Sequence, residues 1–386
     1  MADATSNKAI LVTKKYFGSP VKAPSCTFET TWSDGLDTTE ATTSGKVRLA
    51  SRFEESGSGL TIRRRLKTCD VKASSDVEYE DSSVCMFHAC SQLERITLPS
   101  GFCENVKNVA GMFSGCTRLG WISLPEGFGK NADCDQDEYL SDDAGLFSGC
   151  TELSVVHLPE GFFENAKVSS QQFMNCTGLK QISMPKGFSR NATAIRGTFC
   201  GCSGLTSITL NNDFGRNVST SFSSIFKNCS SLTELKIPDS VFADATKSEE
   251  CSFTSLFEGC SSLKKLTLPK GFGSKCVGSP NTTTSSIYTY FMFNGCKSLQ
   301  TIEGDLSLKY SFSLAECESL NEASVVNVLN SLPDVSDVAQ AEGGDPVTGE
   351  KIFRSITLPS KWNTILSDSE KRIAKDKNWH ISYSTR

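Results

Sequence analysis

Residues and patterns that mark enzymes are scarce in this chain. Histidine occurs three times in 386 residues, at His88, His157 and His380. No two of these share a motif, and the sequence has no nucleophile elbow, phosphate-binding loop or paired catalytic carboxylates. We therefore expect a non-enzymatic protein that needs no cofactor.

Long apolar runs are also missing. None approaches the roughly 20 residues that cross a membrane, so we expect no membrane insertion. Residues 1–15 lack the apolar segment of a secretory signal. We also find no lipobox and no cell-wall sorting motif in the given sequence.

An excess of positive charge is absent as well. The chain has 39 basic and 44 acidic residues, a formal net charge of −5. The short basic run Arg63–Arg65 fits a solvated strand face. Nucleic-acid-binding surfaces need a larger basic patch, so we expect no nucleic-acid partner.

The dominant feature of the sequence is a repeated motif, Phe-x-x-Cys-x-x-Leu-x-x-Ile-x-Leu-Pro, complete in the copy Phe113–Pro125. It returns at intervals of about 26 to 36 residues, a period typical of solenoids. The eight clear copies begin at Phe87, Phe113, Phe147, Phe173, Phe199, Phe226, Phe257 and Phe293, and a degraded ninth begins at Leu314.

Cysteine is abundant, with 17 in the chain. On successive rungs of a solenoid, equivalent cysteines point the same way about 4.8 Å apart, whereas disulfides need facing Cβ atoms about 3.8 Å apart. No Cys-x-x-Cys pair exists, so we expect no zinc site. We predict buried free thiols at the repeat positions Cys90, Cys116, Cys150, Cys176, Cys202, Cys229, Cys260, Cys296 and Cys317.

The spacing changes within each repeat. The Leu-x-x-Ile-x-Leu part ends in a period of two, which predicts a short strand with Ile and the last Leu inward. The residue before the repeat cysteine is usually Gly or Asn, as at Gly115 and Asn175, which predicts a positive φ there. A following Pro-x-Gly-Phe, as in Pro125–Phe128, predicts a type I turn with Pro second and Gly fourth, and a Phe in the core.

The repeats divide the chain into three parts: residues 1–80, the solenoid at 81–320, and residues 321–386. In the first part we expect strands at 9–13, 46–53 and 60–66, the last two forming a hairpin, and a loop at 20–44. This β-rich part either caps the first rung or attaches the protein to something else.

The C-terminal part is predicted to close the other end as a small α/β cap. We expect a helix at 321–332, a strand at 354–359 and an edge strand at 379–383. The run Ser367–Glu370 is a capping box that begins a second helix ending near Lys377.

From about residue 84 to 320, the Phe-x-Gly-Cys-x-x-Leu-x-x-Ile-x-Leu-Pro pattern resembles the leucine-rich repeats of BspA-like surface proteins. That resemblance implies a right-handed leucine-rich repeat solenoid with a parallel sheet of short strands. It also implies adhesion to, or recognition of, a host protein or glycan at a cell surface. Similar arrays occur in phage-encoded proteins, so the alternative is a structural or receptor-binding part of a virion or surface assembly, attached through residues 1–80.

The residues before and after each strand Ile should point away from the core. Most are polar, but Trp121, Val155 and His157 lie on adjacent rungs, between rungs that carry Arg95 and Gln181. Exposed aromatic residues are favoured anchors in interfaces. We therefore predict that these five residues form the partner-binding face, unless the insertion at 131–144 folds over Trp121.

That insertion contains alternating carboxylates, at Asp133, Asp135 and Asp137. A calcium loop would need Gly at the sixth place and Glu at the twelfth, where the chain has Glu138 and Ala144. We expect a solvated acidic loop with no metal site.

Overall fold

The protein is described by a computed structural model for residues 25–32, 37–43, 65–73, 85–132, 145–244, 251–275, 291–336 and 354–385. The chain divides into two compact units, residues 1–189 and 190–386. The three-part division at residues 80 and 320 stays a sequence-based prediction.

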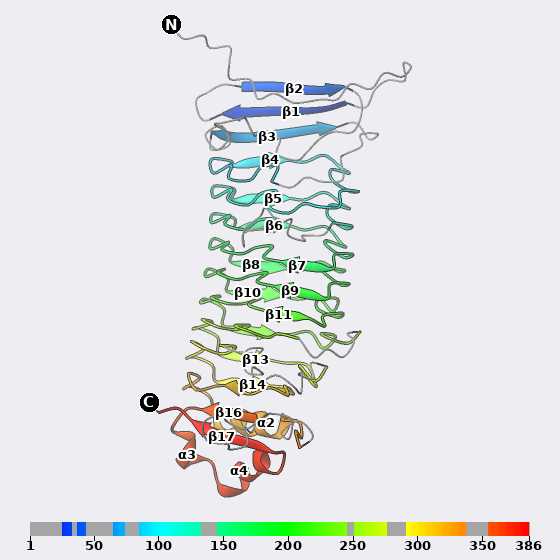
Figure 1. Cartoon of the computed structure of the whole chain (residues 1–386). Helices are drawn as coiled ribbons and strands as arrows, with labels where there is room; N and C mark the ends of the chain where they lie inside the picture. The colour runs from blue at the N-terminus through cyan, green and yellow to red at the C-terminus, as the bar shows by residue number, and fades with distance from the viewer. Residues whose placement is uncertain are drawn as a thin grey trace, which may run out of the picture. The chain divides into compact units, whose positions relative to one another are not determined.

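The first unit begins with a small antiparallel sheet and continues as a ladder of parallel strands (Figure 1). β1 (Ser25–Trp32) lies between β2 (Asp37–Thr43) and β3 (Leu66–Ala73), antiparallel to both. β3 pairs in parallel with the first repeat strand, and the later strands follow along the chain. The remaining strands of this unit are β4 (Arg95–Thr97), β5 (Trp121–Ser123), β6 (Val155–His157), β7 (Val168–Ser170) and β8 (Gln181–Ser183).

The loop expected at residues 20–44 is wrong, because β1 and β2 lie there. Threonine is β-branched and favours strands, and Phe28 and Thr30 alternate toward the interior, with exposed fractions of 2% and 6%. The strands expected at 9–13 and 46–53 lie outside the described residues. So does the one expected at 60–66, apart from Arg65 and Leu66, and Leu66 begins β3.

The second unit contains further short parallel strands and ends in a mixed α/β region. β9 (Ala194–Arg196) pairs with β11 (Ser221–Ser223), and β13 (Lys265–Thr267) lies between β12 (Glu234–Lys236) and β14 (Thr301–Glu303). A final parallel sheet has the order β15, β16, β17. The other elements of this unit are β10 (Ser207–Thr209), β15 (Phe312–Ser313), α2 (Glu322–Ser331), β16 (Arg354–Leu358), α3 (Trp362–Ile365), α4 (Asp368–Lys375) and β17 (Trp379–Tyr383).

Two helices near the C-terminus, α2 and α4, begin at the residues that the sequence predicts. Asn321 caps α2 by accepting a hydrogen bond from the backbone of Ser324. Ser367 and Glu370 form the predicted capping box at the start of α4. The two expected helices are therefore confirmed, and the described residues near the C-terminus also include the short α3.

Phenylalanine and cysteine form parallel ladders inside each unit. In the first unit the rings of Phe87 and Phe113 stack with centroids 5.5 Å apart, and in the second those of Phe226 and Phe257 are 6.1 Å apart. All nine repeat cysteines are buried free thiols, as predicted. The repeated residues thus fill the interior one layer per turn.

Turn geometry explains the repeated glycines. In the eight clear copies the residue before the repeat cysteine has a positive φ, for example 73° at Gly115 and 59° at Asn175, which confirms the prediction. The Pro-x-Gly-Phe turn was assigned wrongly. The Phe128 amide donates to the Pro125 carbonyl and Gly127 has φ of 79°, so Pro is first and Gly third, as a type II turn requires.

Candidate functional site

The exposed side of the first unit's repeat strands carries the predicted binding residues. In β5 the side chain of Ile122 is fully buried, while Trp121 and Ser123 on either side of it are exposed. β4 and β8 show the same alternation. We call the outward residues of β4, β5, β6 and β8 the strand face; they are Arg95, Thr97, Trp121, Ser123, Val155, His157, Gln181 and Ser183.

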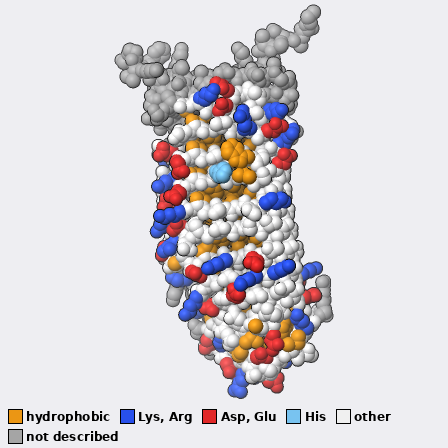
Figure 2. Space-filling view, turned by 180° about the vertical axis from the view of Figure 1, so that it is seen from behind, with side chains coloured by type: hydrophobic (Ala, Val, Ile, Leu, Met, Phe, Trp, Pro, Cys, Tyr) orange, Lys and Arg blue, Asp and Glu red, His pale blue; other side chains and the backbone are white. Residues whose placement is uncertain are grey.

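Three residues of the strand face form an aromatic and aliphatic cluster. β5 and β6 pair in register, with Trp121 opposite Val155 and Ser123 opposite His157. The Trp121 and His157 rings therefore lie diagonally and meet edge to face, with centroids 6.2 Å apart and planes at 68°. Figure 2 shows hydrophobic side chains gathered beside a histidine on such a face.

This cluster exposes much apolar area to solvent. Trp121 is 45% exposed and Val155 is 42% exposed, and they are two of the four large hydrophobic side chains exposed in the described ranges. The indole offers a flat apolar surface with one N–H donor, and the imidazole adds nitrogen atoms beside it. This combination suits a ligand that has an apolar face and hydrogen-bonding groups at its edge.

Polar residues flank the cluster on the neighbouring strands. Arg95 lies on β4, which is adjacent to β5, and Gln181 lies on β8, which is adjacent to β6. Both are exposed, and within the described residues neither side chain makes a hydrogen bond or ion pair. The structure thus brings all five predicted residues onto one face of the first unit.

The acidic insertion falls mostly outside the described residues. Only Asn131 and Ala132 of it are described. The predictions about its calcium binding and its position relative to Trp121 lie outside the described residues and stay predictions. Elsewhere in the described ranges, no three His, Cys, Asp or Glu side chains are placed to hold a metal ion. The described helices also include none long and apolar enough to cross a membrane.

Sequence reasoning missed a hydrogen bond between two asparagines of neighbouring repeats. The Nδ2 of Asn165 donates to the Oδ1 of Asn131 at 2.8 Å, across one turn of the first unit. The sequence carries a signal for it, because an asparagine stands three residues after the Phe of the Pro-x-Gly-Phe turn and after the equivalent Phe214. Asparagines occupy this place in the sequence at Asn105, Asn131, Asn165, Asn191 and Asn217, but the Asn217 amide donates to the Arg190 carbonyl at 2.9 Å instead.

Comparison with known proteins identifies the repeat. Six copies of the BspA type leucine-rich repeat region match residues 67–133, 143–253 and 196–287, more than half of the chain. No curated protein matches the sequence.

Among solved structures, a leucine-rich repeat protein from Bacteroides ovatus aligns with this chain. The alignment has 20% sequence identity and a TM-score of 0.33, and it covers 83% of this chain and 85% of that one. So low a score carries no structural argument, and the assignment rests on the matching repeat model. The predicted leucine-rich repeat solenoid is therefore confirmed, and the chain belongs to the BspA-type leucine-rich repeat family.

Proposed function

We propose that this chain is a non-enzymatic recognition protein that binds a host protein or glycan through the strand face of its first unit. The observation that supports this proposal is the exposed cluster of Trp121, Val155 and His157. Solenoids use extended surfaces of this kind for binding. In this proposal Trp121 is the anchor.

The physical argument starts from the solvent exposure of Trp121. A large aromatic ring held in water gains free energy when a partner covers it, and tryptophan is enriched among residues that dominate binding energy. Its flat ring packs on the apolar face of a sugar or on a peptide side chain. Arg95 and Gln181 then supply donors and acceptors at the rim, where polar contacts select among partners.

The proposal also includes a place for the protein, at the surface of a cell or virion. Membership of the BspA-type repeat family supports a role in interaction. The alternative role, as a structural or receptor-binding part attached through residues 1–80, has less support. β3 pairs directly with β4, which favours a cap on the repeats over a separate attachment module.

An array experiment tests the proposal. The wild-type chain is applied to glycan and host-protein arrays, and the affinity for each hit is then measured for Trp121→Ala. We expect a loss of about 2 kcal/mol, roughly 30-fold, as for other interface anchors. Ile365→Ala is the matched control, because Ile365 is 46% exposed but lies in the second unit.

The control should bind like the wild type. If Trp121→Ala also keeps full affinity while its circular dichroism is unchanged, the strand face is not the binding site. The hits would then have to be assigned to the insertions or to residues 1–80.

A further inference from the structure

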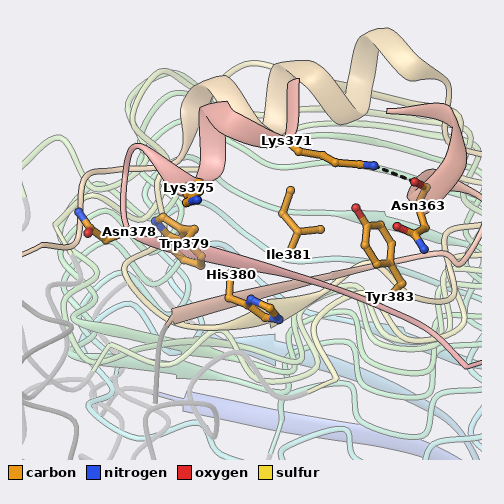
Figure 3. Close-up of a pocket in the computed structure, with 8 residues that line it drawn as sticks. All are labelled: Asn363, Lys371, Lys375, Asn378, Trp379, His380, Ile381 and Tyr383. Atoms are coloured by element: carbon orange, nitrogen blue, oxygen red, sulfur yellow. Dashed lines mark hydrogen bonds between the residues drawn. The ribbon is translucent and has the colours of Figure 1, made fainter. Parts of the chain in front are cut away.

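The second unit contains a pocket of about 540 Å³ beside its last strand. α4 and α3 lie on one side of it and β17 on the other (Figure 3). Its volume is within the range of about 300–1,000 Å³ usual for small-molecule sites. The residues that line it are Asn363, Lys371, Lys375, Asn378, Trp379, His380, Ile381 and Tyr383.

The floor of the pocket is apolar. Trp379, Ile381 and Tyr383 alternate along β17, so their side chains lie on the same side of the strand, and Figure 3 shows Ile381 and Tyr383 directed toward α4. The Trp379 indole donates to the Pro333 carbonyl at 2.8 Å, and its ring packs edge to face on Phe312. This anchoring makes the Trp379 end of the floor rigid.

The rim of the pocket is positively charged. Lys371 and Lys375 are four residues apart on α4 and therefore share one face of the helix. The Lys371 ammonium donates to the backbone carbonyl of Asn363 at 2.8 Å, which draws its side chain across the pocket. An ammonium has three donors, so two N–H groups of Lys371 remain for a ligand.

Negative charge is kept away from this rim. None of the described residues that line the pocket is an Asp or a Glu, although the whole chain has a net charge of −5. Of the carboxylates in and beside α4, Glu370 accepts hydrogen bonds from Ser367, and Asp368 and Asp376 do not line the pocket. The electrostatic preference of the pocket is thus for an anion.

We propose that this pocket binds a small organic carboxylate with an aromatic or aliphatic body. The carboxylate pairs with the ammonium group of Lys375, and the body packs on Ile381 and Tyr383. The Lys371 ammonium lies on the other side of Ile381, where it adds positive charge to the rim (Figure 3). The Tyr383 phenol, whose pKa is raised by partial burial, is a hydrogen-bond donor at neutral pH. This site is independent of the strand face and of the function proposed for it.

Calorimetric titration of the full chain with three probes tests the charge and the apolar body separately. 4-Phenylbutyrate has both, its neutral amide 4-phenylbutanamide lacks the charge, and acetate lacks the body. We expect 4-phenylbutyrate to bind with a Kd of about 1 mM or tighter. The other two should bind ~5-fold more weakly or worse, the size expected when one exposed ion pair or one apolar contact is lost.

Two variants of α4 assign the binding to this pocket. Lys375→Gln and Arg372→Gln each remove one positive charge from the same exposed helix, but Arg372 does not line the pocket. We expect ~5-fold weaker binding of 4-phenylbutyrate by Lys375→Gln and less than ~2-fold change in Arg372→Gln. No binding by the wild type, equal binding of the acid and the amide, or equal effects of the two variants would each overturn the proposal.

Discussion

The thiol of Cys116 donates a hydrogen bond to the backbone carbonyl of Phe87 in the preceding turn, with a sulfur–oxygen distance of 3.2 Å. Cys150 makes the same bond to Phe113 at 3.1 Å. A thiol is small and apolar enough for the interior, yet it is a weak donor that satisfies a buried carbonyl. This dual role gives a physical reason for cysteine at the repeat position. The same bond is made in the second unit by Cys229, Cys260 and Cys296.

The first prediction concerns the reactivity of these thiols. In the native protein without reductant, N-ethylmaleimide should leave the nine repeat cysteines unlabelled, because they are buried and protonated. Cys200, which is half-buried, should react first among the described cysteines. After unfolding all of them should be labelled, as mapped by mass spectrometry. Disulfides between repeat cysteines would show that the thiol ladder is wrong.

The second prediction concerns alkaline pH. Burial raises the pKa of the Cys150 thiol from its ordinary value of 9.0 to about 12. The unfolded chain therefore ionises this thiol at a lower pH than the folded chain does. The resulting stabilisation is complete below pH 9 and is lost between pH 9 and about 12.

Urea unfolding from pH 8 to pH 11 measures this loss. The free energy of unfolding should fall above pH 9. In Cys150→Ala it should fall less steeply, by up to ~1.4 kcal/mol per pH unit. Identical slopes for the wild type and Cys150→Ala would mean that the native thiol is not shielded from ionisation.

The third prediction compares the loss of stability that alanine causes at three positions of one solenoid turn in the second unit. Leu205 is fully buried, Ile208 is half-buried and Thr209 is exposed. The period of two predicts that the strand Ile lies fully inside, and the half-buried Ile208 shows that this prediction is wrong for this turn. Replacement of Leu205 by Ala should cost about 2–5 kcal/mol, replacement of Ile208 less, and replacement of Thr209 under ~0.5 kcal/mol. Urea denaturation followed by circular dichroism should give this order, and any other order would contradict the burial of the strand.

The fourth prediction concerns Gly304, which has a φ of 82°. A Cβ added there would collide with the carbonyl oxygen of Leu268, and the left-handed backbone alone costs a larger residue about 1–2 kcal/mol. Gly304→Ala should therefore lose about 2 kcal/mol or more in thermal or urea unfolding. Gly120→Ala is the control, since its nearest neighbour would be the Glu152 carbonyl at 3.9 Å, and equal losses would refute the argument.

The repeat strands could be predicted because their signal is local. Ile122 is buried between the exposed Trp121 and Ser123, as a period of two requires. The positive φ at Gly115 and the capping box at Ser367 follow equally from residue type and spacing. These features depend on neighbours a few residues away, which the sequence shows directly.

Other features depend on contacts that the sequence does not show. β7 is rich in serine, and Ser169 is nevertheless fully buried because the Ser189 hydroxyl donates to its oxygen at 2.8 Å. The edge-to-face contact of Trp121 with His157 depends on the register between β5 and β6. The pocket at β17 exists only because α4 is placed beside that strand.

The alternation on β4, β5 and β8 assigns packing of the core and contact with the surroundings to different side chains of the same strand. Side chains such as Ile122 hold the turn together, while their immediate neighbours Trp121 and Ser123 face solvent. Substitution of the outward residues therefore changes what a partner meets without changing the packed layer beneath. Evolution, or an engineer building a binding library, can therefore vary this surface rung by rung while the scaffold keeps its stability.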